Sequence, residues 1–198
     1  MPTAVIELGV GNTASMMFAL ERLGADAVLT ADPAEVAQSE RVILPGVGAA
    51  AFAMGQLRKL GLAEPLRAFS RPLLGVCLGQ QLLYEGSEEG DAEGLGLIPG
   101  RAFKLASAPD RPVPHMGWNS LTVERADPLL EGVEDGGFVY FVHSFACPIS
   151  GATLASTDYG APFSAVVRSG NAWGCQFHPE RSSAVGARIL KNFLELPC

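Results

Sequence analysis

The stretch from Pro72 to Glu85 constrains the fold more than any other part of the chain. Its two apolar runs with a turn between them predict a buried strand, a sharp turn and a helix. Gly75, Cys77 and Gly79 give the spacing Gly-x-Cys-x-Gly, the cysteine counterpart of an elbow in which a strand-to-helix turn carries a nucleophile. Small neighbours let such a turn close without clashes, and the start of a helix favours a thiolate anion. The alternative is a buried cysteine that packs as a small hydrophobic side chain.

Composition and charge limit the kind of protein. The 198 residues are 48% hydrophobic and 18% charged, which predicts one globular domain over residues 1–198. The net charge of −7 argues against nucleic acid and anionic membranes as main partners, because both need basic patches. No apolar run approaches the roughly 18 residues of a membrane span, and the N-terminus lacks the pattern of a signal peptide. Four irregularly spaced cysteines and three scattered histidines predict free thiols in a reducing cytoplasm, with no metal site and no cofactor.

The first half of the chain alternates between strand and helix patterns. We expect strands at Ala4–Leu8, at Ala27–Thr30 and from Arg41, and a helix at about Ala49–Leu60 with Phe52, Leu57 and Leu60 facing inward. This alternation predicts a doubly wound, mainly parallel sheet flanked by helices, with sites at the carboxyl ends of its strands. The turn Gly9–Thr13 lacks the third glycine of the dinucleotide-binding pattern G-x-G-x-x-G, so that function is disfavoured.

The second half of the chain differs in composition and in its secondary-structure pattern. A segment rich in glycine and acidic residues, Gly86–Gly100, is followed by six short strand patterns and a closing helix. The expected strands are Gly100–Ala106, Asn119–Glu124, Gly137–Val142, Ala152–Thr157, Phe163–Ser169 and Ala172–Phe177, and the helix is Ser183–Leu196. We therefore expect an α/β fold of the flavodoxin-like type, with a mainly parallel central sheet and an antiparallel C-terminal extension.

A second motif lies about a hundred residues after Cys77. A strand is expected to carry His178 to its end, and Glu180 follows two residues later. A thiol nucleophile needs an imidazole as general base and acid, and a carboxylate can orient that imidazole. Cys77, His178 and Glu180 are therefore predicted to form a catalytic triad. The alternative is a satisfied surface or core histidine, which is the commoner fate of a lone one.

Acyl transfer also needs backbone N–H groups that stabilise a developing oxyanion. Leu78, the residue after the nucleophile, is expected to supply one. The loop Pro45–Gly48, with Gly46, Val47 and Gly48, is the candidate for the other, because glycine lets a peptide plane turn at little steric cost. We hypothesise that this turn of the loop switches the enzyme on. An ordinary strand-to-helix connection is the alternative.

Gly75–Gln81 and His178–Glu180 together resemble the class I glutamine amidotransferases, the group with a Cys-His-Glu triad. Further stretches are similar to one branch of this family, the glutaminase subunits of imidazole glycerol phosphate synthases of histidine biosynthesis. These stretches are Val42–Ala49, Ser87–Gly90 with Gly94–Gly100, Pro112–Asn119 and Tyr140–Ser144. The similarity runs from about Ala4 to Phe193, and Pro-His-Met-Gly-Trp-Asn is its most specific part.

The resemblance implies a role for each matching residue. Cys77 would attack the side-chain amide of L-glutamine, His178 would protonate the departing ammonia and later activate water, and Glu180 would orient His178. The α-amino and carboxylate groups of the substrate would be held by Gln81, Glu89 and the backbone near Ser144 and Phe145. The partner would be a (β/α)8-barrel cyclase subunit, bound as a heterodimer, that receives the ammonia. The interface would carry Met116, Trp118, Asn119, Tyr140 and Arg181.

Some positions depart from the family's common pattern. They are Glu7-Leu8, Gln80 and Arg181. Glu7-Leu8 and Arg181 are expected near the partner subunit, so they leave the details of the interface in doubt. Lysine is frequent in the family where Arg181 stands, and arginine is not equivalent to lysine. Three alternatives remain: another class I glutaminase subunit, a DJ-1-like hydrolase with a Cys elbow, and a non-catalytic glutamine-binding subunit. His-Pro-Glu and the Pro-Gly-Val-Gly loop disfavour the hydrolase, and the complete triad disfavours the non-catalytic subunit.

Overall fold

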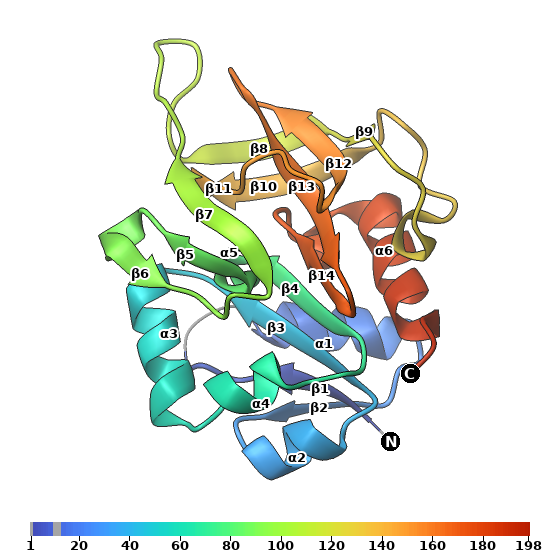
Figure 1. The fold of residues 1–198 in the computed structure, drawn as a ribbon. Helices are drawn as coiled ribbons and strands as arrows, with labels where there is room; N and C mark the ends of the chain where they lie inside the picture. Colours follow the sequence, from blue (N-terminus) through green and yellow to red (C-terminus); the bar gives the residue numbers. More distant parts are fainter. Residues whose placement is uncertain (1, 10–12) are drawn as a thin grey trace.

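The computed structural model describes residues 2–9 and 13–198 (Figure 1). Its largest sheet has the strand order β2-β1-β3-β4-β14-β13-β12-β9. The bounds are β1 Thr3–Ile6, β2 Ala27–Thr30, β3 Arg41–Gly46, β4 Leu73–Cys77, β9 Thr122–Val123, β12 Thr153–Asp158, β13 Pro162–Ser169 and β14 Ala172–Cys175. Pairing is parallel from β2 to β14 and antiparallel from β14 to β9. The expected α/β fold with an antiparallel extension is confirmed.

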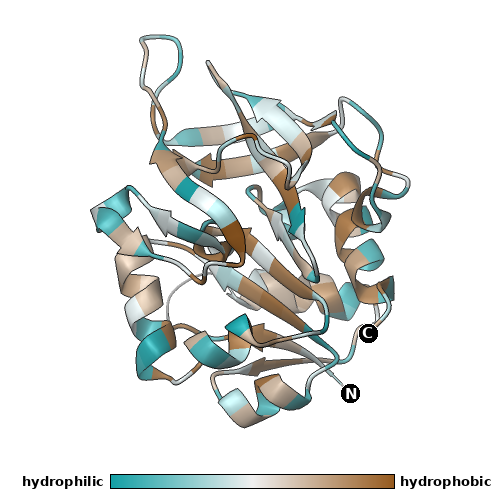
Figure 2. Ribbon diagram, viewed as in Figure 1, coloured by the Kyte–Doolittle hydropathy of each residue, from teal (hydrophilic) through white to brown (hydrophobic). Residues whose placement is uncertain are grey.

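Helices cover both faces of this sheet. On one face α1 (Thr13–Arg22) and α6 (Ser183–Glu195) pack against Val5 and Ile43. On the other face α2 (Pro33–Gln38), α3 (Ala50–Lys59), α4 (Ala63–Arg67) and α5 (Leu78–Leu83) pack against Ala4 and Val42. Successive strand residues thus feed opposite apolar layers, as a sheet buried on both faces requires. Figure 2 shows the hydrophobic colour gathered on these central strands.

Two smaller sheets complete the fold. One has the order β11-β7-β5-β6, formed by Phe145–Ala146, Ile98–Lys104, Tyr84–Ser87 and Ala92–Glu93. The other pairs β8 (His115–Ser120) with β10 (Phe138–His143) in antiparallel register, and we call this pair the ribbon. Short 3-10 turns lie at η1 (Glu89–Asp91), η2 (Pro128–Leu130) and η3 (Pro179–Arg181). No helix in the described part of the chain is long and apolar enough to cross a membrane.

Several expectations about single elements were wrong. Phe52 on α3 is 49% exposed, because the inward stripe of that helix is formed by Ala53, Met54 and Leu57. The helix α2 was not expected, although Asp32 caps its first turn by accepting from Ala34 N.

The strand expectations also need correction. The expected strand Asn119–Glu124 is divided between β8 and β9, and β14 pairs in parallel with β4 as well as antiparallel with β13. Pro45 and Gly46 belong to β3 and not to a loop. Of the turn Gly9–Thr13, residues 10–12 lie outside the described residues.

Candidate active site

The elbow has the expected strand, turn and helix. Cys77 ends β4 with φ +55° and ψ −110°, a conformation that L residues rarely adopt. A Cβ atom on Gly79 would lie 1.8 Å from the Leu44 carbonyl oxygen, and one on Gly75 would lie 2.5 Å from the Gly79 carbonyl oxygen. The two glycines therefore let α5 pack directly against β3 and β4, and this close approach fixes the sharp turn at Cys77.

His178 lies just beyond the end of β14, and its backbone N–H donates to the Tyr140 carbonyl on the ribbon at 3.0 Å. Its ring Nδ1 lies 2.8 Å from Glu180 Oε1. Because an ionised carboxylate only accepts, Nδ1 carries the proton. Nε2 is buried and has no hydrogen-bond partner among the residues described. Glu180 thus orients the ring and leaves Nε2 available for proton exchange.

The charge on His178 depends on its two neighbours. Burial alone would lower the pKa of His178, but the interactions of the ring with the Cys77 thiolate and the Glu180 carboxylate outweigh burial and raise the pKa to about 10. The end of β14 lies beside Cys77, because β14 pairs with β4 with Cys175 opposite Val76 and Gln176 Nε2 donates to Cys77 Sγ at 3.8 Å. The structure therefore brings the three predicted triad residues together from β4, the end of β14 and η3.

A cavity of about 300 Å³ opens beside Cys77, and we call it the Cys77 pocket. Its lining comes from the segment after β3, the end of β4, α5, η1, the end of the ribbon and the start of β11. It consists of Val47, Gly48, Cys77, Leu78, Gln81, Glu89, Pro114, Val142, His143, Ser144 and Phe145. This volume suits a small ligand. Every residue predicted for substrate binding lines it. His178, Glu180 and Gly46 line a smaller cavity of about 20 Å³ on the other side of Val47.

The predicted oxyanion segment is split by the end of β3. Gly46 pairs with Cys77 in the sheet register, so the two strand ends lie side by side. Gly48 has φ +88°, and a Cβ atom there would meet nothing within 4 Å. Glycine is therefore needed at this position for its backbone conformation and not for space. Val47 and Leu78 both line the Cys77 pocket.

Two polar side chains in the pocket are held by the protein itself. Gln81 Nε2 donates to the Phe145 carbonyl at 2.8 Å and to Gln176 Oε1 at 3.1 Å. The amide is thereby turned so that its oxygen is left to accept. Glu89 Oε2 accepts from the first N–H of α3, that of Ala50, at 2.8 Å. Both side chains present acceptors, which is what a substrate ammonium group needs.

The ribbon exposes one face. Met116 and Trp118 are 63% and 52% exposed, and the Trp118 ring meets the Tyr140 ring edge-on with centroids 6.0 Å apart. The Arg181 guanidinium lies 5.1 Å from the centroid of Tyr140. Asn119 belongs to the opposite face, where it donates to the Asp158 carbonyl at 2.9 Å. Four of the five predicted interface residues thus share one exposed surface, and Asn119 does not.

Several residues around the site were missed. Gln176 Nε2 donates to Cys77 Sγ at 3.8 Å, and Val142 presents its carbonyl to the same sulfur at 3.8 Å. These contacts depend on how strand ends converge, for which the sequence holds no signal. His115 and His143, two of the three scattered histidines, lie opposite each other on the ribbon, and His143 lines the Cys77 pocket.

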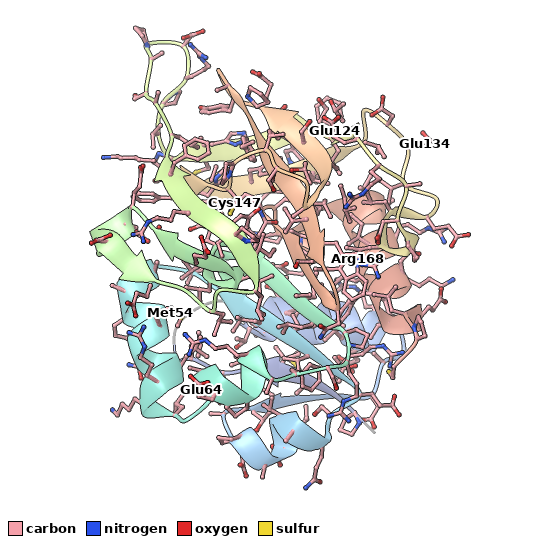
Figure 3. All side chains as sticks on the ribbon, in the orientation of Figure 1. Met54, Glu64, Glu124, Glu134, Cys147 and Arg168 are labelled. Carbon is pink, nitrogen blue, oxygen red and sulfur yellow. The ribbon has the colours of Figure 1, made fainter. Side chains whose placement is uncertain are left out.

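The remaining thiols differ from Cys77. Cys147, labelled in Figure 3, is buried, and burial raises the pKa of its thiol to about 12. Burial likewise raises the pKa of Cys175. Neither lines the Cys77 pocket. Across residues 2–9 and 13–198, no three His, Cys, Asp or Glu side chains are grouped so as to hold a metal ion.

Known proteins are similar to this chain in fold and in sequence. The family model for the class-I glutamine amidotransferases matches residues 4–196. A solved glutamine amidotransferase superposes with a TM-score of 0.77 at 22% identity over 98% of both chains. PurLQS from Thermotoga maritima gives a TM-score of 0.72 at 20% identity over 98% of both chains. The chain therefore belongs to the class-I glutamine amidotransferase family.

Sequence relatives narrow this assignment. The imidazole glycerol phosphate synthase subunit HisH of Xanthomonas euvesicatoria pv. vesicatoria (strain 85-10) is 53% identical over 98% of this chain and 96% of that protein. The HisH subunit of Xylella fastidiosa (strain Temecula1 / ATCC 700964) is 52% identical over the same shares. Within the amidotransferase family, the chain belongs with these HisH subunits.

Proposed function

We propose that this chain hydrolyses L-glutamine to glutamate and ammonia, with Cys77, His178 and Glu180 as its catalytic residues. The observation that carries this proposal is the position of His178. Its Nδ1 is bound by Glu180, its Nε2 has no partner within the described residues, and Cys77 is close enough to raise its pKa. This is the arrangement that a thiol nucleophile needs.

The steps follow from these positions. The Cys77 thiolate attacks the side-chain amide carbon of glutamine, and the carbonyl oxygen becomes an oxyanion. The N–H of Leu78 and an N–H of Gly46, Val47 or Gly48 stabilise it. His178 then gives its proton to the leaving nitrogen, ammonia departs and a thioester remains. Water attacks the thioester with His178 as base, and glutamate leaves.

The pocket supports glutamine as the substrate. Glu89 and the Gln81 carbonyl oxygen accept from the substrate ammonium group, and the backbone N–H groups of Ser144 and Phe145 donate to its carboxylate. Glutamine carries both groups at the end of the molecule that does not react. One subsite of acceptors and one subsite of donors in the same pocket therefore select it.

Ammonia release requires an acceptor nearby. Ammonia in neutral water is mostly ammonium, which has no lone pair with which to attack. We therefore assign this chain as the glutaminase subunit that delivers ammonia to a (β/α)8-barrel cyclase in histidine biosynthesis, as the names of its relatives suggest. The exposed ribbon face with Met116, Trp118 and Tyr140, together with Arg181, is the surface that the cyclase would cover.

Two broader assignments accompany this function. Both apolar layers pack on one sheet, which supports treating residues 1–198 as a single domain. The four cysteines are free thiols, which fits the reducing cytoplasm as the place of the reaction.

Glutamate release with and without a candidate cyclase and its ligand tests the function. We expect Cys77→Ala to abolish release, and Cys175→Ala, which removes another buried thiol, to retain it. An electrophilic glutamine analogue should label Cys77 only. Release that survives Cys77→Ala, or labelling that moves to Cys175, would contradict the mechanism. Loss of the cyclase effect in Trp118→Ala, with unchanged activity of the isolated chain, would support the ribbon as the interface.

A further inference from the structure

A line of hydrogen bonds connects the ribbon to the Cys77 pocket. Asn119 Nδ2 lies 3.5 Å from His115 Nε2, His115 Nδ1 lies 3.1 Å from His143 Nε2, and His143 Nδ1 lies 2.8 Å from the Phe145 carbonyl oxygen. That carbonyl also accepts from Gln81 Nε2 at 2.8 Å. Two donors from different elements therefore hold the peptide between Phe145 and Ala146, next to the Ser144–Phe145 backbone that lines the pocket.

These contacts fix the position of every proton in the line. A carbonyl only accepts, so His143 Nδ1 must carry hydrogen. A neutral His143 then offers a lone pair at Nε2, so His115 Nδ1 must carry hydrogen as well, and His115 Nε2 must accept. Asn119 is oriented as a donor by its bond to the Asp158 carbonyl. Both histidines are thus Nδ1–H tautomers, whereas neutral histidine in water favours the Nε2–H form.

The surroundings keep both rings neutral and in place. His115 is stacked between Tyr159 and Phe141, with ring centroids 4.0 Å and 4.8 Å away. Burial lowers the pKa of His115 to about 4 and that of His143 to about 3. At neutral pH neither ring carries the second proton that would reverse a bond in the line.

We propose that His115 and His143 are positioning residues for glutamine binding: His115 donates to His143 Nε2 and so holds the His143 ring, and His143 fixes the Phe145 carbonyl so that the adjoining Ser144–Phe145 backbone faces the substrate carboxylate. This inference rests on the proposed function, because it takes that backbone as the carboxylate subsite. Neither histidine contacts the reacting amide. Their loss should therefore weaken binding and spare the chemical step.

The test compares His115→Phe with Tyr159→Phe. Phenylalanine at position 115 keeps a ring in the stack but removes the Nδ1 donor, so the buried Nε2 of His143 loses its partner and the ring is no longer held against the Phe145 carbonyl. We expect KM for glutamine to rise about tenfold, as loss of one charge-assisted contact implies, with kcat changed by less than about twofold. The control Tyr159→Phe loses only the bond from its hydroxyl to the Pro112 carbonyl and should keep the wild-type KM.

Nitrogen-15 NMR of the histidine rings supplies a second readout that needs no turnover. The wild-type chain and Tyr159→Phe should show His143 as the Nδ1–H tautomer with a hydrogen-bonded Nε2, and in His115→Phe the Nε2 resonance should move to that of a nitrogen without a hydrogen bond. An unchanged KM in His115→Phe, or an Nε2–H tautomer of His143 in the wild-type chain, would overturn the inference. Absence of any Cys77-dependent glutamate release from the wild-type chain would instead contradict the proposed function. The tautomer of His143 would still test whether its ring fixes the Phe145 carbonyl.

Discussion

His143 lines the Cys77 pocket and His178 lines the smaller cavity next to it, and the difference between the two histidines is chemical. The residues are almost equally buried, at 8% and 5% exposed. His178 meets a carboxylate and a thiolate, and the pKa of its ring is raised to about 10. His143 meets a carbonyl and a neutral imidazole, and the pKa of its ring is lowered to about 3, with burial as the main cause. The charged partner, and not the depth of burial, decides which histidine carries a proton at neutral pH.

The comparison assigns the two histidines to two tasks. A ring with a raised pKa and an unpartnered Nε2 can give and take a proton, so we place the chemical step on the side of His178. A neutral ring that has both nitrogens engaged can only hold its neighbours still. Variants on the first side should lower kcat, and variants on the second side should raise KM.

The largest expected difference comes from His178→Asn. Removal of the general acid and base should lower kcat by roughly 10³-fold or more with little change in KM. Steady-state glutamate release measures both constants. His115→Phe is the matched comparison, because it removes a buried imidazole near the same pocket and should keep kcat. A kcat of His178→Asn within tenfold of wild type would end the distinction between the two sides.

Glu180→Gln should have the next largest effect. The amide keeps the shape of the side chain but removes the negative charge that stabilises the imidazolium, so the pKa of His178 should fall from about 10. We expect kcat to drop by roughly 10²-fold, since a glutamine can also hold the wrong tautomer. NMR titration of the His178 ring measures the pKa directly. A titration midpoint that stays where it was would show that Glu180 is not the cause of the shift.

The triad side could be predicted from the sequence because its geometry is local. His178 and Glu180 are two residues apart in one turn, and the elbow spacing places Cys77 at the end of a strand. Convergence of these two strand ends follows from a parallel sheet, in which β14 lies beside β4. The short spacings within the two motifs, together with the rule that sites lie at the carboxyl ends of parallel strands, were enough to predict the triad.

The histidine pair could not be predicted in the same way. His115 and His143 meet because β8 and β10 pair with those two residues opposite each other. A shift of one residue in this register would send each ring to the other face of the ribbon. Register here follows from packing of Val139 and Phe141 against the core, which alternation alone does not place. Asn119 was assigned to the interface for the same reason, although it faces inward.

Acid should act on the two sides with opposite signs. The unfolded chain protonates His115 below about pH 6.5, whereas the folded chain resists until about pH 4, so the stabilising contribution is complete above 6.5 and is lost as the pH falls. At about 1.4 kcal/mol per unit of pKa shift, His115 should account for about 2 kcal/mol of the stability lost between pH 7 and pH 5. Urea unfolding at both pH values measures this loss, and His115→Phe should reduce it. An equal loss in the variant would contradict the neutral assignment.

His178 provides the control for this pH effect. The pKa of its ring is raised in the folded state, so its contribution is complete below about pH 6.5 and is lost as the pH rises toward 10. His178→Asn should therefore make the loss between pH 7 and pH 5 larger by under about 1 kcal/mol, and should flatten the stability curve on the alkaline side. A smaller loss between pH 7 and pH 5 in this variant would mean that the two histidine sites are not independent.

Gly48→Val should give the smallest effect, and it separates the two walls of the pocket. Gly48 lines the Cys77 pocket next to Val47, which also lines the smaller cavity at His178, and its φ of +88° is strained for any residue with a Cβ atom. Open space around that Cβ position means that a fall in activity would come from the backbone and not from a clash. If a turn of this segment supplies an oxyanion N–H, valine should lower kcat by about tenfold and leave KM near the wild-type value. A rise in KM at constant kcat, which is the result expected for His115→Phe, would place Gly48 with substrate binding and remove the proposed switch from this loop.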